Sequence, residues 1–147
     1  MVAIKPAQQT DANWMRQVEQ KCFTSEDAYS IQQIKNLIKS KSSITEIIYN
    51  EDTPVGWACW TTRSNSKSVR LYTIGILPEH SGNGYGTQYL EFKLKQFEQL
   101  GYKRAVLEVR EKSRAVKFYH EQAFITDDYL LDYYGENQHG LRMYKNL

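Results

Sequence analysis

A glycine-rich run near the middle of the chain, Ser81–Thr87, has the residue types of an anion-binding turn. Gly82, Gly84 and Gly86 place three residues without a Cβ in five positions, so the backbone there can come close to a ligand. Where such a turn opens a helix, the first backbone N–H groups have no helical partner and attract an anion such as a phosphate. The spacing differs from the dinucleotide fingerprint, and no Lys-Ser/Thr pair follows as in a nucleotide P-loop, so a plain flexible loop is the alternative.

The segments on either side of the glycine run predict a strand before it and a helix after it. Arg70–Leu77 is rich in β-branched and aromatic residues and stops at Pro78, which is typical of a strand. The helix is predicted to end at Leu100, with Gly101 as the first residue beyond it. Apolar residues recur through this helix at helical spacing: Leu90, Leu94 and Phe97. The glycine run is therefore predicted to be a strand-to-helix turn.

A glutamate within an apolar strand is a second candidate for chemistry. Glu108 lies in the predicted strand Ala105–Val109, and a glutamate is rarely buried without a partner. An ion pair with Arg104 or Arg110 is the plain explanation, and a general base is the functional one.

The cysteines and histidines predict neither a disulfide nor a metal site. Cys22 and Cys59 are predicted to be buried free thiols. The three histidines have no partners at metal-ligand spacing: His80, His120 and His139. We therefore expect no metal.

Length and composition predict one domain over residues 1–147. A hydrophobic content of 41% and a charged content of 24% are ordinary for a globular protein. The net charge of +2 is too balanced for a dedicated nucleic-acid binder, but it does not repel an acidic ligand. No signal peptide precedes the strand-like Val2–Ile4, and no apolar run approaches the length of a membrane span. We expect a cytoplasmic protein with no membrane or nucleic-acid partner.

The rest of the chain alternates between strands and helices. Further strands are predicted over Val2–Pro6, Ile44–Tyr49, Val55–Thr62, Phe124–Leu131 and Leu141–Tyr144. Further helices are predicted from the N-cap pair Thr10 and Asp11 to near Phe23, from Ser30 to a basic end over Lys39–Lys41, and from the N-cap Ser113 through Tyr119.

This order of elements predicts a mixed α/β fold. Ala105–Val109 follows a helical crossover, so it should lie parallel to Arg70–Leu77. We predict a central mixed, mostly antiparallel sheet with one splayed parallel strand pair, flanked by about four helices. A ligand site then falls at the C-terminal ends of the parallel pair, beside the glycine turn.

Two stretches of the sequence resemble the GCN5-related N-acetyltransferase (GNAT) superfamily. Ile74–Thr87 is similar to its acetyl-CoA motif. Leu107–Arg110, followed by Ala115–Tyr119 and Phe124, is similar to the second half of its domain. Within the superfamily the sequence most resembles the ribosomal-protein-alanine N-acetyltransferase type, which acetylates protein N-termini. The predicted element order agrees over nearly the whole chain.

The resemblance implies that acetyl-CoA is the co-substrate, and it assigns residues to that molecule. The amides of the glycine turn would hold the CoA pyrophosphate, namely those of Gly82, Asn83, Gly84, Tyr85, Gly86 and Thr87. The strand before the turn would bond the pantetheine through the backbone of Ile74, Gly75 and Ile76. Lys112 stands where the family has a cofactor-contacting asparagine; it could reach a phosphate instead, or lie in solvent.

The resemblance also implies a catalytic pair and an acceptor site. Glu108 takes the place of the glutamate that acts as general base, and Tyr119 that of the tyrosine that protonates the departing thiolate. The amine would attack the thioester directly in a ternary complex. Tyr133 and Tyr134 resemble paired tyrosines beside the peptide, and Phe23–Tyr29 lies where this fold usually builds the acceptor groove. The plain alternatives are a core aromatic at Tyr119 and loop aromatics at the other two tyrosines.

Three positions depart from the family pattern. Ser81 replaces the Gln or Arg that usually opens the turn and helps to order it. The connection that contains Lys112 is one residue shorter, and Ala123 replaces a glycine before the strand that starts at Phe124.

Three functions remain open at this point. The first is transfer of acetyl from acetyl-CoA to a protein or peptide N-terminal amine. The second keeps the chemistry but uses a small amine, such as a polyamine, an amino acid or an aminoglycoside. The third is an acyl-CoA-binding module without turnover, and the presence of both Glu108 and Tyr119 argues against it. The partner is thus an amine acceptor, and both a monomer and a homodimer remain possible.

Overall fold

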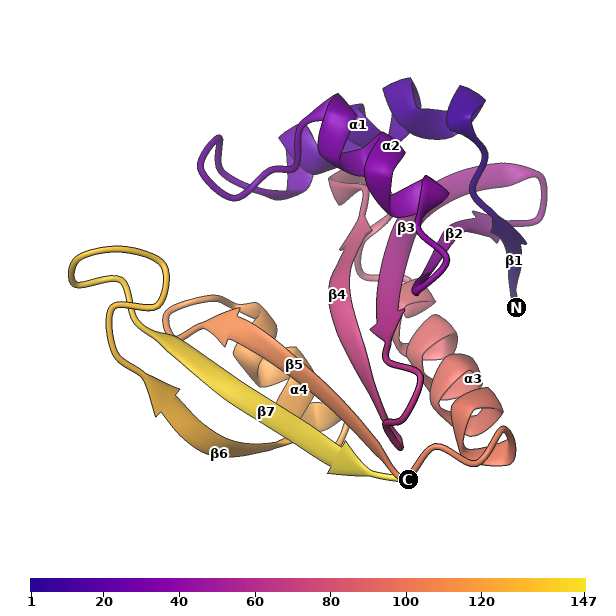
Figure 1. Cartoon of the computed structure of the whole chain (residues 1–147). Coiled ribbons are helices and arrows are strands. Elements are labelled where there is room, and N and C mark those ends of the chain that lie inside the picture. The colour runs from indigo at the N-terminus through magenta and orange to yellow at the C-terminus, as the bar shows by residue number, and fades with distance from the viewer. The chain divides into compact units, whose positions relative to one another are not determined.

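Seven strands and four helices follow one another in the order shown in Figure 1, a computed structural model that describes residues 1–147. The strands are β1 (Val2–Pro6), β2 (Ser43–Asn50), β3 (Thr53–Thr62), β4 (Ser68–Ile76), β5 (Arg104–Arg110), β6 (Ile125–Leu130) and β7 (Gly140–Asn146). The helices are α1 (Ala12–Cys22), α2 (Ile31–Lys39), α3 (Tyr85–Gln99) and α4 (Ala115–Glu121). Two short 3-10 turns, η1 (Gln9–Asp11) and η2 (Pro78–His80), precede α1 and the glycine run.

The strands form one mixed sheet in the order β1-β2-β3-β4-β5-β7-β6. The β1–β2, β2–β3, β5–β7 and β6–β7 pairs are antiparallel, and β4–β5 is parallel. The parallel ladder joins Ser68–Arg70 to Arg104–Val106 and ends there. The predicted fold class is confirmed: a mostly antiparallel α/β sheet with one parallel pair and four helices.

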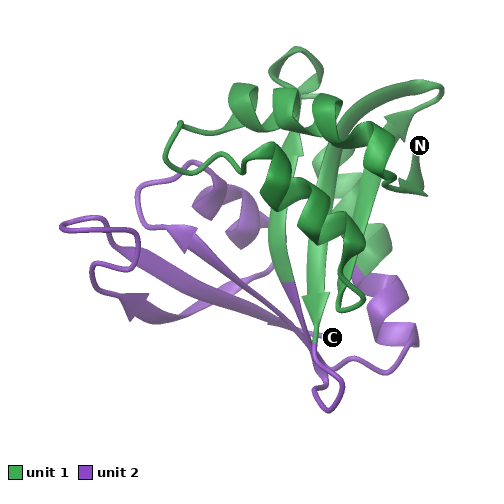
Figure 2. Ribbon diagram, turned by 45° about the horizontal axis from the view of Figure 1, so that its top comes forward, with its two compact units in different colours: residues 1–62, 71–93 green, residues 63–70, 94–147 purple.

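The chain divides into two compact units, coloured separately in Figure 2. The first contains residues 1–62 and 71–93, and the second contains residues 63–70 and 94–147. The division passes through β4 after Arg70 and through α3 after Lys93. Each unit has its own arrangement of helices and strands.

In the first unit, α1 and α2 cover one face of the strands and the start of α3 covers the other. Because side chains alternate along a strand, Trp57 and Cys59 of β3 lie on one face, where they join a core with Met15 and Val18 of α1. Trp60 lies on the opposite face and bonds Tyr89 of α3.

In the second unit, β5 alternates strictly between buried and half-buried residues. Ala105, Leu107 and Val109 are buried, so Glu108 faces the other side of the strand. The helix α4 packs on β5, and Tyr119 and Phe124 are buried near its end.

The helix ends agree with the sequence except at the starts of α1 and α4. Gly101 follows α3 with φ +96, and the N–H of Tyr102 bonds the carbonyl of Phe97, as in a Schellman motif. The Ser113 hydroxyl accepts the Ala115 N–H at the start of α4, although the N-cap residue is Arg114, one residue later. Asp11, however, does not cap α1: its carboxylate accepts the N–H of Gln8 instead, because a 3-10 turn precedes the helix.

The two outermost strands of the sheet, β1 and β6, are both irregular. β1 ends in Pro6, which has no N–H to donate. β6 is exposed along most of its length, and its pairing with β7 shifts register between Thr126 and Asp128. No helix is both long and apolar enough to cross a membrane.

Candidate active site

The glycine run forms the turn from η2 into α3, as predicted. Gly82 and Gly84 have φ +81 and +78, a left-handed conformation that glycine adopts without strain. A Cβ at either residue would meet no atom within 4 Å. The first helical bond of α3 is donated by Gln88 to the Gly84 carbonyl, so the amides of Tyr85 and Gly86 have no helical carbonyl to bond. The turn therefore offers open space and N–H groups without a helical partner, which suit an anion.

Two polar side chains brace the turn from behind. The Ser81 hydroxyl donates to the carbonyl of Pro78 over 2.8 Å, and the Asn83 side chain donates to that of His80 over 3.0 Å. These bonds tie the glycine turn to η2. Ser81 therefore orders the turn by a short local bond, although it lacks the long side chain that usually stands at this position.

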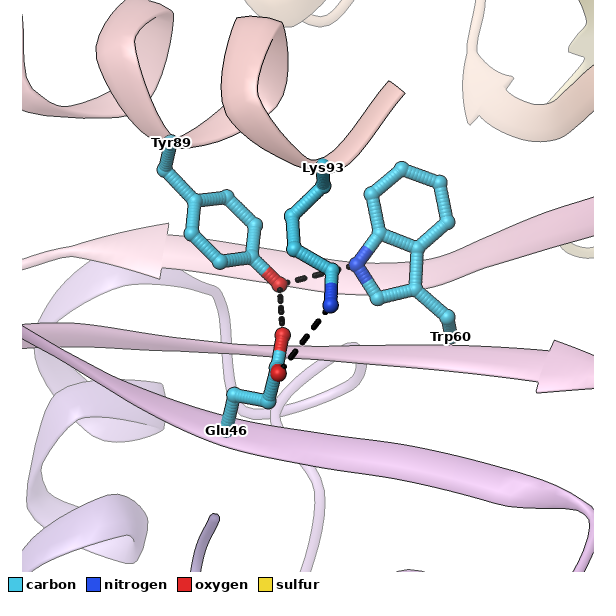
Figure 3. A network of polar contacts seen from close by, with 4 residues as sticks. All are labelled: Glu46, Trp60, Tyr89 and Lys93. Atoms are coloured by element: carbon cyan, nitrogen blue, oxygen red, sulfur yellow. Dashed lines mark hydrogen bonds and ion pairs between the residues drawn. The ribbon is translucent and has the colours of Figure 1, made fainter. Parts of the chain in front are cut away.

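A buried polar network fixes the start of α3 to the sheet, as Figure 3 shows. The phenol of Tyr89 donates to Glu46 over 2.8 Å and accepts the indole N–H of Trp60 over 2.8 Å. The ammonium group of Lys93, whose side chain is only 4% exposed, donates to the second oxygen of Glu46 over 3.1 Å. Burial and the neighbouring carboxylate hold the pKa of Tyr89 well above its usual value, so the phenol stays a donor. The network gives the glycine turn a rigid base.

The side chains of β4 stop alternating regularly between the two faces of the sheet just before the glycine turn. Tyr72 packs against the core beneath α1 and α2, and Gly75 faces Val18 and Cys22 on α1. Residues three apart in a regular strand point to opposite faces, so the alternation is broken between Tyr72 and Gly75, as at a β-bulge. Such a break leaves backbone groups without a ladder partner.

The backbone at Gly75 and Ile76 is closely surrounded. A Cβ on Gly56 of β3 would overlap the Gly75 carbonyl oxygen, so only glycine permits this approach. The Cys22 thiol donates to the carbonyl of Ile76 over 3.2 Å. Burial raises the pKa of Cys22 to about 11, with smaller contributions from Glu19 and Glu79, so this thiol stays protonated and unreactive.

Glu108 lies between two arginines of the neighbouring strands, and neither is the partner expected from the sequence. Its carboxylate pairs with Arg70 of β4, and its other oxygen lies 3.8 Å from Nε of Arg142. Arg142 is its cross-strand partner on β7 and also reaches Asp128. The Glu108 side chain is 9% exposed. An ion pair at Glu108 is thus present, but not with Arg104 or Arg110.

Tyr119 is buried on α4 between two other aromatic rings. Its ring contacts those of Phe118 and Phe124 edge-on, at centroid distances of 5.4 and 5.8 Å. Burial raises the pKa of the Tyr119 phenol well above its ordinary value, with a smaller contribution from Tyr134. The phenol therefore keeps its proton at any physiological pH and can act as a proton donor.

The two loop tyrosines differ in their surroundings. Tyr133 is 47% exposed, whereas Tyr134 is half-buried beneath the guanidinium of Arg110, 4.6 Å from the ring centroid. Their rings meet edge-on, at 4.9 Å between centroids. Lys112 is exposed on the connection between β5 and α4.

The sequence of residues 12–124 matches the Acetyltransferase (GNAT) family. The chain belongs to this family. The matched region includes the glycine turn, Glu108 and Tyr119. No protein among those with curated functions matches the sequence. As a GNAT acetyltransferase the chain is an enzyme of a family that uses acetyl-CoA, and the open glycine turn at the start of α3 fits the anionic part of that co-substrate.

Solved structures of other acetyltransferases share this fold at low sequence identity. The ribosomal-protein-S18-alanine N-acetyltransferase of Escherichia coli superposes with a TM-score of 0.86 at 18% identity, covering 99% of this chain and 94% of that one. The PaiA N-acetyltransferase of Thermoplasma acidophilum, solved with coenzyme A, gives 0.82 at 16% identity, over 100% and 99% of the two chains. The spermidine/spermine N-acetyltransferase of Vibrio cholerae gives 0.79 at 18% identity, over 99% and 92%.

Sequence reasoning missed some polar residues of this acetyltransferase. Arg70 and Arg142 come from different strands, and only the sheet register places them beside Glu108. Glu19 is fully buried on α1. Its burial could have been predicted from the sequence, because Met15, Val18 and Glu19 stand at i, i+3 and i+4, which is the spacing of one helical face.

Proposed function

We propose that this enzyme transfers the acetyl group of acetyl-CoA to the N-terminal amine of a protein or peptide, by direct attack in a ternary complex. One observation carries the chemistry: β5 presents a carboxylate at Glu108, and the helix that follows buries a phenol at Tyr119 that keeps its proton. A base and an acid of this kind are what an aminolysis of a thioester requires.

The proposed steps balance with these two residues alone. Glu108 takes the proton that the ammonium group of the acceptor must lose, directly or through water. The amine nitrogen then forms a bond to the acetyl carbon, the carbon–sulfur bond breaks, and the Tyr119 phenol protonates the departing thiolate. The nitrogen, which now carries one proton too many for an amide, loses that proton to solvent. Solvent restores the proton of Tyr119 and removes that of Glu108. No covalent enzyme intermediate is formed.

Two backbone regions have roles in binding within this proposal. The amides of residues 82–87 hold the pyrophosphate of acetyl-CoA, in keeping with their open and positively polarised position. The backbone of Ile74, Gly75 and Ile76 bonds the pantetheine, and an N–H left free by the irregularity of β4 stabilises the oxyanion. The exposed Lys112 has room to reach a phosphate.

The choice of acceptor rests on the tyrosine pair and on the similar structures. Tyr133 and Tyr134 present two rings on the β6–β7 connection, and a protein N-terminal acetyltransferase is among the structures that share the fold. A small polyamine is the second candidate, because a spermidine/spermine acetyltransferase shares the fold as well and the α1–α2 connection carries Glu26 and Asp27.

One screen separates these candidates. The purified enzyme and acetyl-CoA are offered peptides with varied first residues, the same peptides with blocked N-termini, and spermidine, free amino acids and an aminoglycoside. CoA release and product mass are followed. We expect an unblocked peptide to be acetylated with a kcat/KM at least about tenfold above that of any small amine and of its blocked form. A faster reaction with spermidine than with every peptide would favour the second candidate instead.

A further inference from the structure

The most unusual group in the first unit is the carboxyl of Glu19. Glu19 lies on the apolar face of α1 and is 0% exposed. Neither of its oxygens has a hydrogen-bond partner. Buried carboxylates are almost always paired, so this side chain requires a physical explanation.

The segment that lies over Glu19 is the α1–α2 connection, residues 23–30. Within it, the carbonyl of Tyr29 accepts a 2.6 Å hydrogen bond from the guanidinium of Arg16 on α1. The ring of Tyr29 stacks on that of Tyr72 in β4, with 5.3 Å between centroids and 19° between planes. Tyr29 therefore ties the connection both to the helix that carries Glu19 and to the central strand.

The charges around Glu19 favour its neutral form. Burial raises its pKa from 4.5 to about 8, and Asp27 on the connection acts in the same direction. The guanidinium of Arg16 and the nearby N–H of Tyr29 oppose this shift only in part. The Cys22 thiol, one turn further along α1, is itself uncharged, since its pKa is raised to about 11. At neutral pH a protonated Glu19 is thus compatible with full burial.

Ionisation would make the same arrangement unfavourable. A fully buried carboxylate whose oxygens accept no hydrogen bond is unfavourable, and Asp27 adds repulsion from the connection that covers it. The covering segment is the part that can move, because it holds no helix or strand and its outer residues, Thr24–Glu26, are exposed.

We propose that Glu19 is a positioning residue that keeps the α1–α2 connection closed while its carboxyl is protonated and releases the connection when it ionises. This inference rests on the proposed function in one respect: the connection takes part in acceptor binding. Glu19 then acts through Tyr29, without touching either substrate, and the KM for the acceptor rises as the pH increases toward 8.

Hydrogen exchange of the intact protein tests the release without any need for activity. Amide exchange in residues 23–30 is measured from pH 6 to 9.5 and divided by the intrinsic rate at each pH. We expect protection in the wild type to fall by up to about tenfold per pH unit between pH 6 and about pH 8, because release costs the closed form its proton, and to level off above pH 8. Glu19→Gln should keep the protection constant, and Glu98→Gln, which removes an exposed carboxylate on α3, should behave as the wild type.

Two results would overturn the inference: constant protection in the wild type across this range, or the same loss of protection with rising pH in Glu19→Gln. If the glutamine variant fails to fold, Glu19→Met replaces it, since it removes both charge and polarity at similar volume. With an active acceptor in hand, the ratio of wild-type to Glu19→Gln acceptor KM should rise with pH up to about pH 8 while the ratio of acetyl-CoA KM values stays constant. An inactive enzyme would contradict the proposed function, but the exchange result would still decide the role of Glu19.

Discussion

The buried phenol of Tyr119 gives a direct test of the proton donor. Tyr119→Phe removes one oxygen and preserves the contacts with Phe118 and Phe124. Since the thiolate would then leave unprotonated, we expect kcat to fall about 10²-fold. Titration calorimetry should give an acetyl-CoA Kd within about twofold of the wild type. Tyr102→Phe, on a ring that packs edge-on against Phe97, is the matched control and should keep the wild-type kcat.

Glu108 can be tested as the base through the pH dependence of the reaction. Glu108→Gln keeps the shape of the side chain but cannot accept a proton, so kcat/KM should fall about 10²-fold or more and lose its acidic limb. The same change removes the ion pairs with Arg70 and Arg142, so stability should be measured in parallel by urea unfolding. A variant that is less stable but retains the wild-type pH profile would show that Glu108 has a structural role only.

At the scale of single elements, the two ends of α3 provide a matched pair of glycines. Gly84 and Gly101 both have positive φ, and a Cβ at either would meet nothing within 4 Å. Alanine at either residue should therefore destabilise the fold by about 1 kcal/mol through backbone strain. Only Gly84→Ala should weaken acetyl-CoA binding, by about tenfold or more, since its methyl group would enter the anion site. Equal effects of the two substitutions on CoA affinity would argue against the glycine turn as that site.

The left-handed backbone conformation of Ala123 predicts that one substitution at this residue makes the protein more stable. This residue follows α4 with φ +68, and the Ala123 and Phe124 amides bond the carbonyls of His120 and Tyr119 in a Schellman motif. The left-handed conformation is strained for alanine and not for glycine, so Ala123→Gly should raise the free energy of unfolding by about 1 kcal/mol. Ala115→Gly, in the helical backbone of α4, should lower it. Urea midpoints would show whether the two changes have opposite signs.

At the scale of the whole molecule, Glu19 should leave a signature in the pH dependence of stability. Its pKa is about 8 in the folded chain and near 4.5 when unfolded, so the folded state binds the proton more tightly. The stabilisation that this bound proton gives to the folded state is fully present below pH 4.5 and is lost as the pH rises toward 8. Above pH 8 the stability does not change further through Glu19. The unfolding free energy of Glu19→Gln minus that of the wild type should therefore increase by a few kcal/mol between pH 4.5 and pH 8. A difference that does not change with pH would contradict the buried protonated carboxyl.

The sequence predicted most of the fold because apolar spacing and turn residues are local properties. The helix that carries Leu90, Leu94 and Phe97, the hairpin of β2 and β3, and the parallel pair were all predicted correctly. The partners of Glu108 were not, because Arg70 and Arg142 reach it only through the register of separate strands. The network around Glu46 was missed for the same reason, since its members come from three elements.

The irregular outer strands affect how the protein behaves in a crowded solution. An incoming chain that tried to extend the sheet past β6 would meet a displaced row of backbone donors and the carboxylates of Asp127 and Asp128. At β1 it would meet Pro6, which has no backbone N–H to donate to a new strand. Both borders of the sheet thus discourage fibril growth, although β6 displays Ile125 and Tyr129 to the solvent.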